Sequence, residues 1–593
     1  MIRTLTAFLA ALFALGIFYT PARAQDPGTR QPNILVILFD DVGFSGFGAY
    51  GGDERTPRID ALAQRGVILS RYYTSPFCGP TRAMLMTGMD SHQVGMGTLV
   101  ETVTPAMRSA PGYSMRWKAD QKTIGTMLSA AGYQTYVTGK WGIGEIGANL
   151  PNKFGFDRSY VMDATGGGNY DAKPYLPGSH SVEWFEDGKP ITLPQDYYSS
   201  RSLVDKMIEY VDAGDPQRPF FGYVALQAAH MPIQVPVEYV DRYNGVFDRG
   251  WDVMREERLG RAIERGLVPP TTTLKPAPEV HRAWNDLTPR ERALATREMQ
   301  VNAGMMEAAD EHIGRLLDHL KAKGQLDNTI VMVLSDNGAE SGQSRISGVA
   351  NLVLDGVKLI EGFDTSYENL GQRRSVTAVG PEWASVLSSP FDLYKFYGSE
   401  GGLRVPFVIA GPGIAASGVE HAPVHVADIV PTMLEAAGVA YDPAQFYGRS
   451  VLAMLKGASD TTYADNESFA LEVSGNAALY RGQWKITRNT PPLGDNQWRL
   501  YDISLDPGET TDLSGANPEL FKEMLAEYQT YADKVGVLEL GPEDNAIEIL
   551  AKNLTEKAAK KYWPYALGLV LALIAAIFFS FKLGAILLRR RLA

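Results

Sequence analysis

The sequence contains a single cysteine, Cys78, among 593 residues. One cysteine excludes an intrachain disulfide. Most free cysteines are small buried apolar side chains, but a thiol can also be kept for its chemistry. The nearby Pro80 and Arg82 favour the second interpretation, and the rest of the chain provides the test.

A block of basic residues is also missing. The chain has 56 lysine and arginine residues against 68 acidic ones, which gives a net charge of −12 at pH 7. Such a balance argues against a nucleic-acid-binding protein, because nothing is available to neutralise a row of phosphates. The sequence has no internal repeat and no low-complexity tract. With 45% hydrophobic and 21% charged residues, it indicates a globular protein long enough for more than one domain.

The N-terminus has the pattern of an export signal. Arg3 precedes an apolar run over residues 5–19, and Ala22-Arg23-Ala24 is a small-x-small cleavage site before Gln25. We therefore expect residues 1–24 to be a signal peptide that is removed. An uncleaved membrane anchor is the alternative interpretation.

A second long apolar segment covers residues 562–581 and contains no charge. At 1.5 Å per residue, such a segment spans roughly the 30 Å hydrocarbon core of a membrane. Aromatic residues stand at its start and basic residues follow its end, an arrangement typical of a membrane anchor whose basic end stays in the cytoplasm. We expect a linker over 541–561, a transmembrane helix over 562–588 and a cytoplasmic tail over 589–593. The large domain would then lie on the extracytoplasmic, periplasmic side; a buried core helix is the alternative.

Three apolar runs predict strands of a mostly parallel sheet, of which residues 33–39 have the continuous pattern of burial on both faces, and residues 133–137 predict a further short strand. In such α/β sheets, ligands bind beyond the carboxyl ends of the strands. The four segments cover residues 33–39, 133–137, 219–226 and 329–334, and they lead to Asp40-Asp41, Lys140, His230 and Asp336-Asn337, respectively. Helical spacing of apolar residues between Met306 and Leu320 predicts a helix that covers this sheet.

The polar residues at these strand ends predict a metal site. Asp40, Asp41, Asp336 and Asn337 form an all-oxygen set, which suits a hard cation such as Ca²⁺ or Mg²⁺ better than Zn²⁺. Solvated turns are the alternative for the acidic residues. His230 is a candidate acid–base group or a core histidine, and a lysine after a strand is commonly a solvated cap.

The C-terminal part has a different pattern. From about residue 461 the chain predicts short strands over 468–473, 477–480, 484–487 and 498–501, followed by a helix over 518–535. We expect a large domain over 32–457 and a smaller α+β domain over 458–540. Residues 341–390 show little periodicity and predict a long functional loop, and residues 401–409 predict a further strand.

Taken together, the motifs resemble those of the formylglycine-dependent (type I) sulfatases of the alkaline-phosphatase superfamily, and among them the bacterial arylsulfatases. The most specific motif is Cys78-x-Pro80-x-Arg82, followed by Thr87-Gly88. The resemblance extends from Pro32 to about Val537. Further blocks that resemble the family are residues 132–135, 139–141, 219–232, 335–338, 394–402, 481–485 and 501–513.

The resemblance implies a large mixed, mostly parallel sheet sandwiched by helices, as in alkaline phosphatase, and hydrolysis of sulfate monoesters. A maturation enzyme would oxidise Cys78 to formylglycine, whose hydrate is the nucleophile. The metal, most simply Ca²⁺ with Mg²⁺ or Mn²⁺ as alternatives, would be held by the four oxygen ligands above. The implied catalytic roles are stabilisation of the hydrate by Arg82, binding of the sulfuryl oxygens by Lys140 and Lys395, activation of the nucleophile by Asp336, and protonation of the leaving alcohol by His230.

One position departs from the family pattern. Where the family has a histidine after Gly-Lys-Trp, this chain has Gly142. That histidine would accept the proton of the second hydroxyl, a task worth about 10²–10⁴ in rate; His92 is a conceivable substitute. Two alternatives therefore stay open: a phosphodiesterase or phosphonate monoester hydrolase that uses the same aldehyde, and a weakly active, membrane-tethered binder of sulfated ligands. We expect residues 165–170 and the loop over 341–390 to wall the pocket, for aryl, alkyl or saccharide sulfates.

Overall fold

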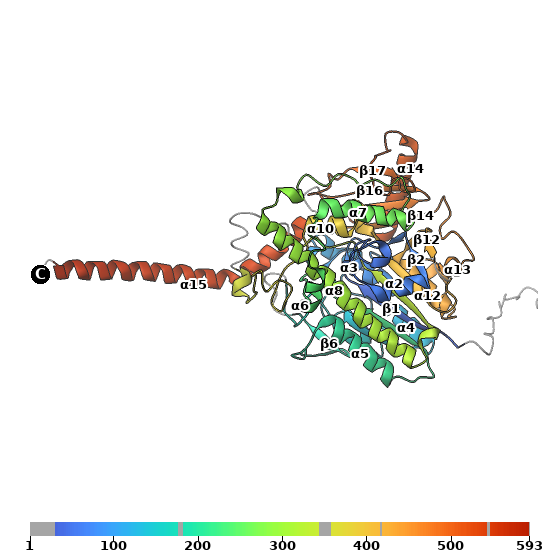
Figure 1. Cartoon of the computed structure of the whole chain (residues 1–593), viewed down its shortest axis with the longest axis horizontal. Helices are drawn as coiled ribbons and strands as arrows, with labels where there is room; N and C mark the ends of the chain where they lie inside the picture. Colours follow the sequence, from blue (N-terminus) through green and yellow to red (C-terminus); the bar gives the residue numbers. More distant parts are fainter. Residues whose placement is uncertain (1–29, 176–181, 343–356, 416–417, 542–545, 592–593) are drawn as a thin grey trace, which may run out of the picture. The chain divides into compact units, whose positions relative to one another are not determined.

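The computed structural model describes residues 30–175, 182–342, 357–415, 418–541 and 546–591 (Figure 1). Pro32–Ala593 forms one compact unit. The predicted signal peptide, residues 1–24, lies outside the described residues.

Among the described residues, ten strands form the main sheet, and its five central neighbours β9, β1, β8, β4 and β5 run parallel. In spatial order the strands are β12 (Gly418–Glu420), β2 (Val67–Leu69), β11 (Phe407–Ala410), β9 (Thr329–Ser335), β1 (Asn33–Phe39), β8 (Phe220–Ala225), β4 (Gln134–Lys140), β5 (Arg158–Met162), β6 (Trp184–Glu186) and β7 (Lys189–Pro190). The predicted α/β class with a large, mostly parallel sheet is confirmed.

The register of the central strands brings their polar carboxyl ends together. Phe39 of β1 pairs with Ser335 of β9, so Asp40 and Asp336 follow at the same level. On the other side, β8 lies between β1 and β4, and Gly139 pairs with Ala225 one residue before Lys140. The expected meeting of these strand ends at one edge of the sheet is therefore present.

Helices cover both faces of the sheet because successive side chains of its buried strands point to opposite sides. Leu35, Ile37 and Phe39 of β1 pack into one core, whereas Ile34, Val36 and Leu38 pack into the other. The first core includes α2 (Pro57–Gln64), α5 (Ser199–Ala213), α6 (Val237–Val240), α7 (Trp251–Glu264), α8 (Pro289–Ala322) and α10 (Pro381–Leu387); the second includes α3 (Cys78–Thr87), α4 (Ile124–Ala130), α12 (Ile429–Ala436) and α13 (Leu452–Leu455). Figure 1 shows α5 and α8 side by side on the first face.

Two smaller sheets complete the described fold. One joins β10 (Arg404–Val405), β3 (Tyr72–Tyr73) and β13 (Val424–His425). The other is antiparallel and consists of β14 (Ser468–Val473), β15 (Asn476–Arg481), β16 (Trp484–Arg488) and β17 (Trp498–Asp502), with α14 (Pro518–Val535) packed on it. These elements match the strands and the helix expected for the C-terminal part.

A buried charged cluster joins this C-terminal sheet to the main body. Lys485 of β16 places its Nζ 3.0 Å from Glu400 Oε1 and 2.8 Å from Glu509 Oε1. Tyr480 of β15 donates a hydrogen bond of 2.7 Å to the same oxygen of Glu400. Glu400 begins α11 (Glu400–Leu403), which leads into β10 and β11.

Three local expectations are corrected. Residues 401–409 are not one strand, because α11 occupies their start and β10 and β11 follow as separate strands. The predicted loop over 341–390 contains α10, whose Trp383 is fully buried; residues 343–356 of that loop lie outside the described part. The segment expected as a linker, residues 541–561, is helical from Ala546 and forms the first part of α15 (Ala546–Arg591).

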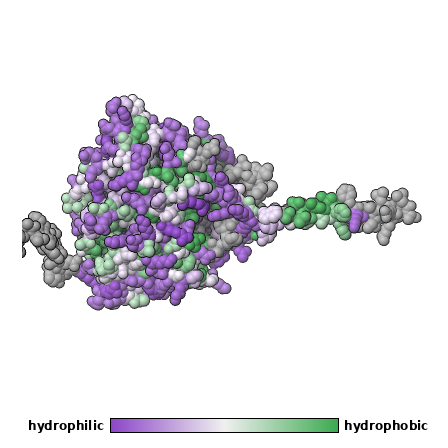
Figure 2. Space-filling model, turned by 180° about the vertical axis from the view of Figure 1, so that it is seen from behind, coloured by the Kyte–Doolittle hydropathy of each residue, from purple (hydrophilic) through white to green (hydrophobic). Residues whose placement is uncertain are grey.

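Helix α15 is, among the described residues, the one helix long and apolar enough to cross a membrane. Eight of its large apolar side chains are exposed, and the helix forms a green stretch in Figure 2. They are Leu567, Val570, Leu571, Leu573, Ile574, Ile577, Phe578 and Phe579. These side chains are not buried as those of a core helix, the alternative interpretation, would be.

Candidate active site

Cys78 is the first residue of α3, directly after the extended residue Phe77, and it is 2% exposed. The Nζ atom of Lys140 lies 3.6 Å from its Sγ. Burial raises the pKa of the thiol to about 11, and Lys140 offsets this only in part. The unmodified thiol is therefore protonated at neutral pH and is a poor nucleophile as it stands.

A buried arginine connects the helix of Cys78 to the strand-end carboxylates. Arg82, one turn further along α3, donates hydrogen bonds of 2.9 and 2.7 Å to Asp336 Oδ2, and its Nη2 lies 3.2 Å from Asp40 Oδ1. One oxygen each of Asp40 and Asp336 and the sulfur of Cys78 lie within 4.8 Å of one another. The cysteine thus faces a preformed cluster of opposite charges.

Two buried lysines reach the aspartates from different parts of the chain. Lys140, at the end of β4, donates to Asp40 Oδ1 and Oδ2 at 2.8 and 2.7 Å. Lys395 donates to Asp41 Oδ2 at 2.9 Å and to Glu340 Oε2 at 2.8 Å. Burial works against the charge of Asp41, but Lys395 and then His230 outweigh it and lower the pKa of Asp41.

His230 follows β8 and faces the same group. Its Nδ1 bonds to the carbonyl of Met231, which can only accept, so Nδ1 carries the proton. Nε2 then points to the site, 3.6 Å from Asp41 Oδ2 and 3.4 Å from Glu340 Oε2. Burial, followed by the charge of Lys140, lowers the pKa of His230 well below its usual value.

The sequence reasoning missed Glu340. It follows Gly338 of the Ser335–Gly338 block by two residues, and no motif or periodicity marked it. Its burial raises its pKa, while Lys395 acts in the opposite direction. Asn337 also belongs to the cluster, because its Nδ2 atom donates a hydrogen bond of 2.6 Å to Asp41 Oδ1. With it, the metal ligands and catalytic residues expected from the sequence all lie in this one cluster.

The donor set fits a hard divalent cation. Asp40, Asp41, Asp336 and Asn337 present oxygen atoms at neighbouring strand ends, and Asp41 N bonds to Asp336 Oδ1 at 3.1 Å. Among the described residues, the Oδ1 atom of Asn337 is buried and has no hydrogen-bond partner. An orphaned buried carbonyl oxygen costs free energy unless it binds something positive.

His92 does not replace the histidine that is missing at Gly142. Its Nδ1 lies 3.1 Å from Asp90 Oδ1 and its Nε2 lies 2.9 Å from Glu472 Oε2 in β14. Tyr531 of α14 donates to the second oxygen of Asp90 at 2.8 Å. Both ring nitrogens are thus committed to a contact between the main body and the C-terminal sheet. The expectation of a catalytic substitute is wrong.

The buried group of Asp90, His92 and Glu472, called the His92 triad below, leads to a prediction about stability. Burial alone would lower the pKa of His92, but Asp90 and Glu472 raise it to about 10. We expect His92→Ala to lower the free energy of unfolding by about 3–5 kcal/mol, because two buried carboxylates lose their counter-charge. The measurement is thermal or denaturant unfolding of the full-length protein in detergent. As a control, His319→Ala removes a more exposed pair with Asp212 and should cost less than about 1 kcal/mol.

The pH dependence of the His92 triad has a definite sign. The folded pKa of His92 lies above the usual value of 6.5, so its contribution is complete below pH 6.5 and is lost as the pH rises toward about 10. The wild type should therefore lose more stability than His92→Ala over that interval. Parallel pH profiles of the two proteins would contradict a charged His92.

Gly142 lies next to the reacting cluster with a left-handed backbone, φ +61°. A Cβ atom there would lie 3.4 Å from both Ala164 O and Lys140 Cε, which is ordinary contact. Space for a side chain exists, but the backbone conformation disfavours one. Glycine at this position leaves the space beside the cluster unfilled, and Gly142 lines a cavity there.

Comparisons with known proteins agree on one family. The sequence matches the Sulfatase family over residues 32–439. An uncharacterized sulfatase of Schizosaccharomyces pombe is 33% identical over 543 residues, which cover 88% of this chain and 96% of that protein. The arylsulfatase of Klebsiella aerogenes is 33% identical over 417 residues, covering 69% and 87% of the two chains. The crystal structure of Ps i-CgsB aligns with a TM-score of 0.60 at 25% identity, covering 85% and 93%. The chain therefore belongs to the sulfatase family, the enzymes that hydrolyse sulfate esters.

Proposed function

We propose that this protein hydrolyses sulfate monoesters with formylglycine, formed from Cys78, as its nucleophile. The observation that carries the proposal is the place of the sole cysteine, 3.6 Å from Lys140 Nζ and within 4.8 Å of carboxylate oxygens of Asp40 and Asp336. The hydrated aldehyde supplies two hydroxyl groups. One attacks sulfur and carries the sulfate; the other then loses its proton and forms the C=O bond again, which breaks the bond between carbon and the sulfated oxygen and releases sulfate. A maturation enzyme must act on Cys78 before it is buried at the start of α3.

The metal ligands in this proposal are Asp40, Asp41, Asp336 and Asn337. They would hold one divalent cation, Ca²⁺ by preference and Mg²⁺ or Mn²⁺ otherwise. When bound, the cation supplies Lewis-acid polarisation of a sulfuryl oxygen. The unpartnered Oδ1 atom of Asn337 supports this assignment.

The other residues handle charge and protons. Lys140 contacts Asp40 and Lys395 contacts Asp41, and the two lysines would neutralise the sulfuryl oxygens. Arg82 holds Asp336 by two hydrogen bonds, so that Asp336 is oriented to take the proton of the attacking hydroxyl. His230 directs Nε2 into the site and would protonate the leaving alcohol. An anionic ester beside His230 favours its protonated form.

We further propose that α15 anchors the enzyme in a membrane with the catalytic domain on the extracytoplasmic, periplasmic side. The exposed apolar stretch of α15 supports the anchor. The basic residues beyond it favour a cytoplasmic end.

A panel of esters tests the proposed reaction. Full-length protein shown by mass spectrometry to carry formylglycine is assayed with para-nitrophenyl sulfate and bis-nitrophenyl phosphate. We expect kcat/KM for the sulfate to exceed that for the phosphodiester by at least about 100-fold, a difference of about 2.7 kcal/mol in transition-state binding. The reverse ratio would identify a phosphodiesterase. Binding of both esters without turnover would identify the tethered binder.

A further inference from the structure

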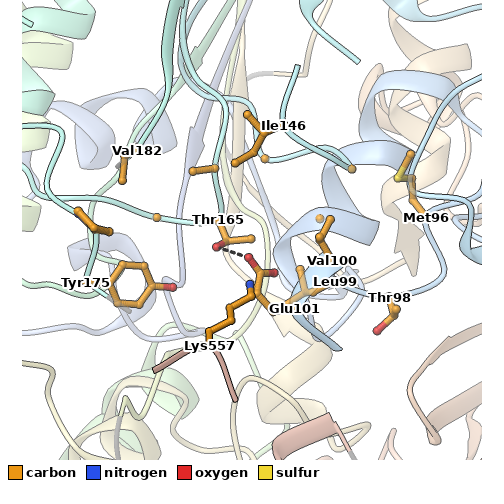
Figure 3. A pocket seen from close by; sticks show the side chains of 16 residues that line it. Met96, Thr98, Leu99, Val100, Glu101, Ile146, Thr165, Tyr175, Val182 and Lys557 are labelled. Carbon is orange, nitrogen blue, oxygen red and sulfur yellow. Dashed lines mark hydrogen bonds between the residues drawn. The ribbon is translucent and has the colours of Figure 1, made fainter. Parts of the chain in front are cut away.

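A cavity of about 160 Å³, whose lining residues Figure 3 shows, has several neighbours of the reacting residues in its wall. Its lining includes the neighbours of three of them: Gly79 follows Cys78, Gly142 lies two residues after Lys140, and Gly166 touches His230. A Cβ atom on Gly166 would lie 2.8 Å from Cε1 of His230. Cys78 and His230 do not line the cavity themselves, but these neighbours place it beside the nucleophile and beside the group proposed to protonate the leaving alcohol. The cavity is therefore placed to hold the leaving group.

The lining of this cavity is mostly apolar. The larger apolar side chains are Met96, Leu99, Val100, Ile146, Tyr175 and Val182, and Ala164 and Pro174 add smaller ones. Thr98, Glu101, Thr165 and Lys557 add polar groups, and Thr165 already donates a hydrogen bond of 3.0 Å to Glu101 (Figure 3). Thr165 and Gly166 of the expected 165–170 wall line this cavity, whereas no described residue of the 341–390 segment does. A sugar would leave most of its hydroxyls without partners here.

One wall of the cavity belongs to the base of α15. Lys557 lines it, and Asn553, one turn earlier, donates a hydrogen bond of 2.7 Å to the backbone oxygen of Glu101. Further back, Ala546 is buried in one cluster with Phe77, Cys78 and Leu99. The helix that carries the apolar anchor thus starts against the nucleophile and passes along the pocket.

The same helix brings the pocket close to the membrane surface. Trp563 and Tyr565 are 60% and 68% exposed and mark the start of the apolar stretch. Trp563 comes six positions after Lys557, which corresponds to a rise of about 9 Å along a helix. A ligand in the pocket therefore lies within about two helical turns of the interfacial aromatic residues.

We propose that the base of α15 is a specificity-determining wall of the leaving-group pocket, and that the enzyme takes sulfate monoesters with an apolar aryl or alkyl group at the membrane surface. The inference rests on the proposed sulfatase function and deepens it. The apolar lining, the vacant space at Gly142 and the junction of α15 with the pocket all favour such amphiphilic esters over saccharide sulfates.

The test uses full-length, formylglycine-bearing protein in phospholipid nanodiscs. Lys557→Glu reverses a charge at the pocket wall, so an anionic aryl sulfate should bind with a KM raised by about fivefold at low salt, with kcat unchanged. Lys552→Glu is the matched control, because Lys552 is also exposed on α15 but does not line the pocket. Equal KM changes in the two variants, or none in Lys557→Glu, would overturn the role of α15.

The leaving-group preference is measured in the same nanodiscs with para-nitrophenyl sulfate, decyl sulfate and a glucose sulfate. We expect kcat/KM for the two apolar esters to exceed that for the sugar ester by at least about tenfold. Equal or better turnover of the sugar ester would overturn the assigned substrate class and leave the sulfatase reaction standing. Lack of turnover with every sulfate ester would overturn the proposed function and this inference with it.

Discussion

Cys78→Ala should lower kcat for sulfate-ester hydrolysis by roughly 10⁵- to 10⁶-fold, the size of loss expected when a covalent nucleophile is removed. The side chain is buried with Phe77, Leu99, Val473 and Ala546, and alanine removes one sulfur atom from that cluster. We expect a stability cost of only about 1 kcal/mol. Steady-state kinetics together with thermal unfolding therefore separate a lost nucleophile from a lost fold.

Cys78→Ser is the informative companion variant. Serine offers one hydroxyl, whereas the hydrated aldehyde offers two. Serine can attack sulfur, but it has no second hydroxyl whose deprotonation could form a C=O bond and release the sulfate. We expect one product molecule per enzyme molecule and then no further turnover. The sulfated serine should appear by mass spectrometry in the peptide that spans residues 75–82.

The wild-type peptide provides the complementary check. It should carry an aldehyde in place of the thiol when a maturation system is present. A fully active enzyme with an unmodified thiol, or wild-type turnover by Cys78→Ala, would refute the assigned nucleophile.

Asp41→Asn should lower both the affinity for the divalent cation and kcat/KM by at least about 100-fold, the upper range for losing even an outer-shell partner of a metal site. Asp41 has a left-handed backbone, φ 64°, which asparagine tolerates better than most residues. The variant thus removes charge with little change of shape. It also leaves Lys395 with one carboxylate partner fewer.

Calorimetric titration with Ca²⁺, Mg²⁺ and Mn²⁺ measures this effect and identifies the preferred ion. Asp310→Asn is the matched control. Asp310 is also a buried carboxylate, but it accepts from the backbone N–H groups of Arg58 and Ile59 at the start of α2. The control should alter stability and leave cation affinity unchanged. Unchanged affinity in Asp41→Asn would remove Asp41 from the ligand set.

The central strands were predictable because burial on both faces leaves continuous apolar runs, and the polar residues that end them stand out in the sequence. Asp40, Lys140 and Asp336 therefore followed from local pattern and parallel register. Glu340 did not, because its role depends on Lys395, which lies 55 positions away in the chain. The structural role of His92 was not predictable for the same reason, because its partner Glu472 is far away in sequence and no local signal indicates the contact.

The errors in secondary structure have local causes. Helix α10 is short, and all but its first residue are buried, so it lacks the polar stripe that marks an amphipathic helix. Helix α11 was not predicted because two of its four residues are glycine, which is a poor helix former. The base of α15, in contrast, is rich in Ala, Glu, Lys and Leu, and this composition was a usable signal for a helix.

The buried cluster of Glu400, Lys485 and Glu509 links catalysis to the folding of the small sheet. Glu400 lies five residues after Lys395, and two of its partners, Tyr480 and Lys485, belong to β15 and β16. Melting of that sheet alone would take Lys485 and Tyr480 away from Glu400 and leave Arg404, 3.4 Å away, as its remaining charged partner. The loss of a buried ion pair makes this partial melting unfavourable. Partial unfolding from the C-terminal side is therefore suppressed, and the enzyme gains or loses its lysine-bearing loop and its small sheet in one cooperative step.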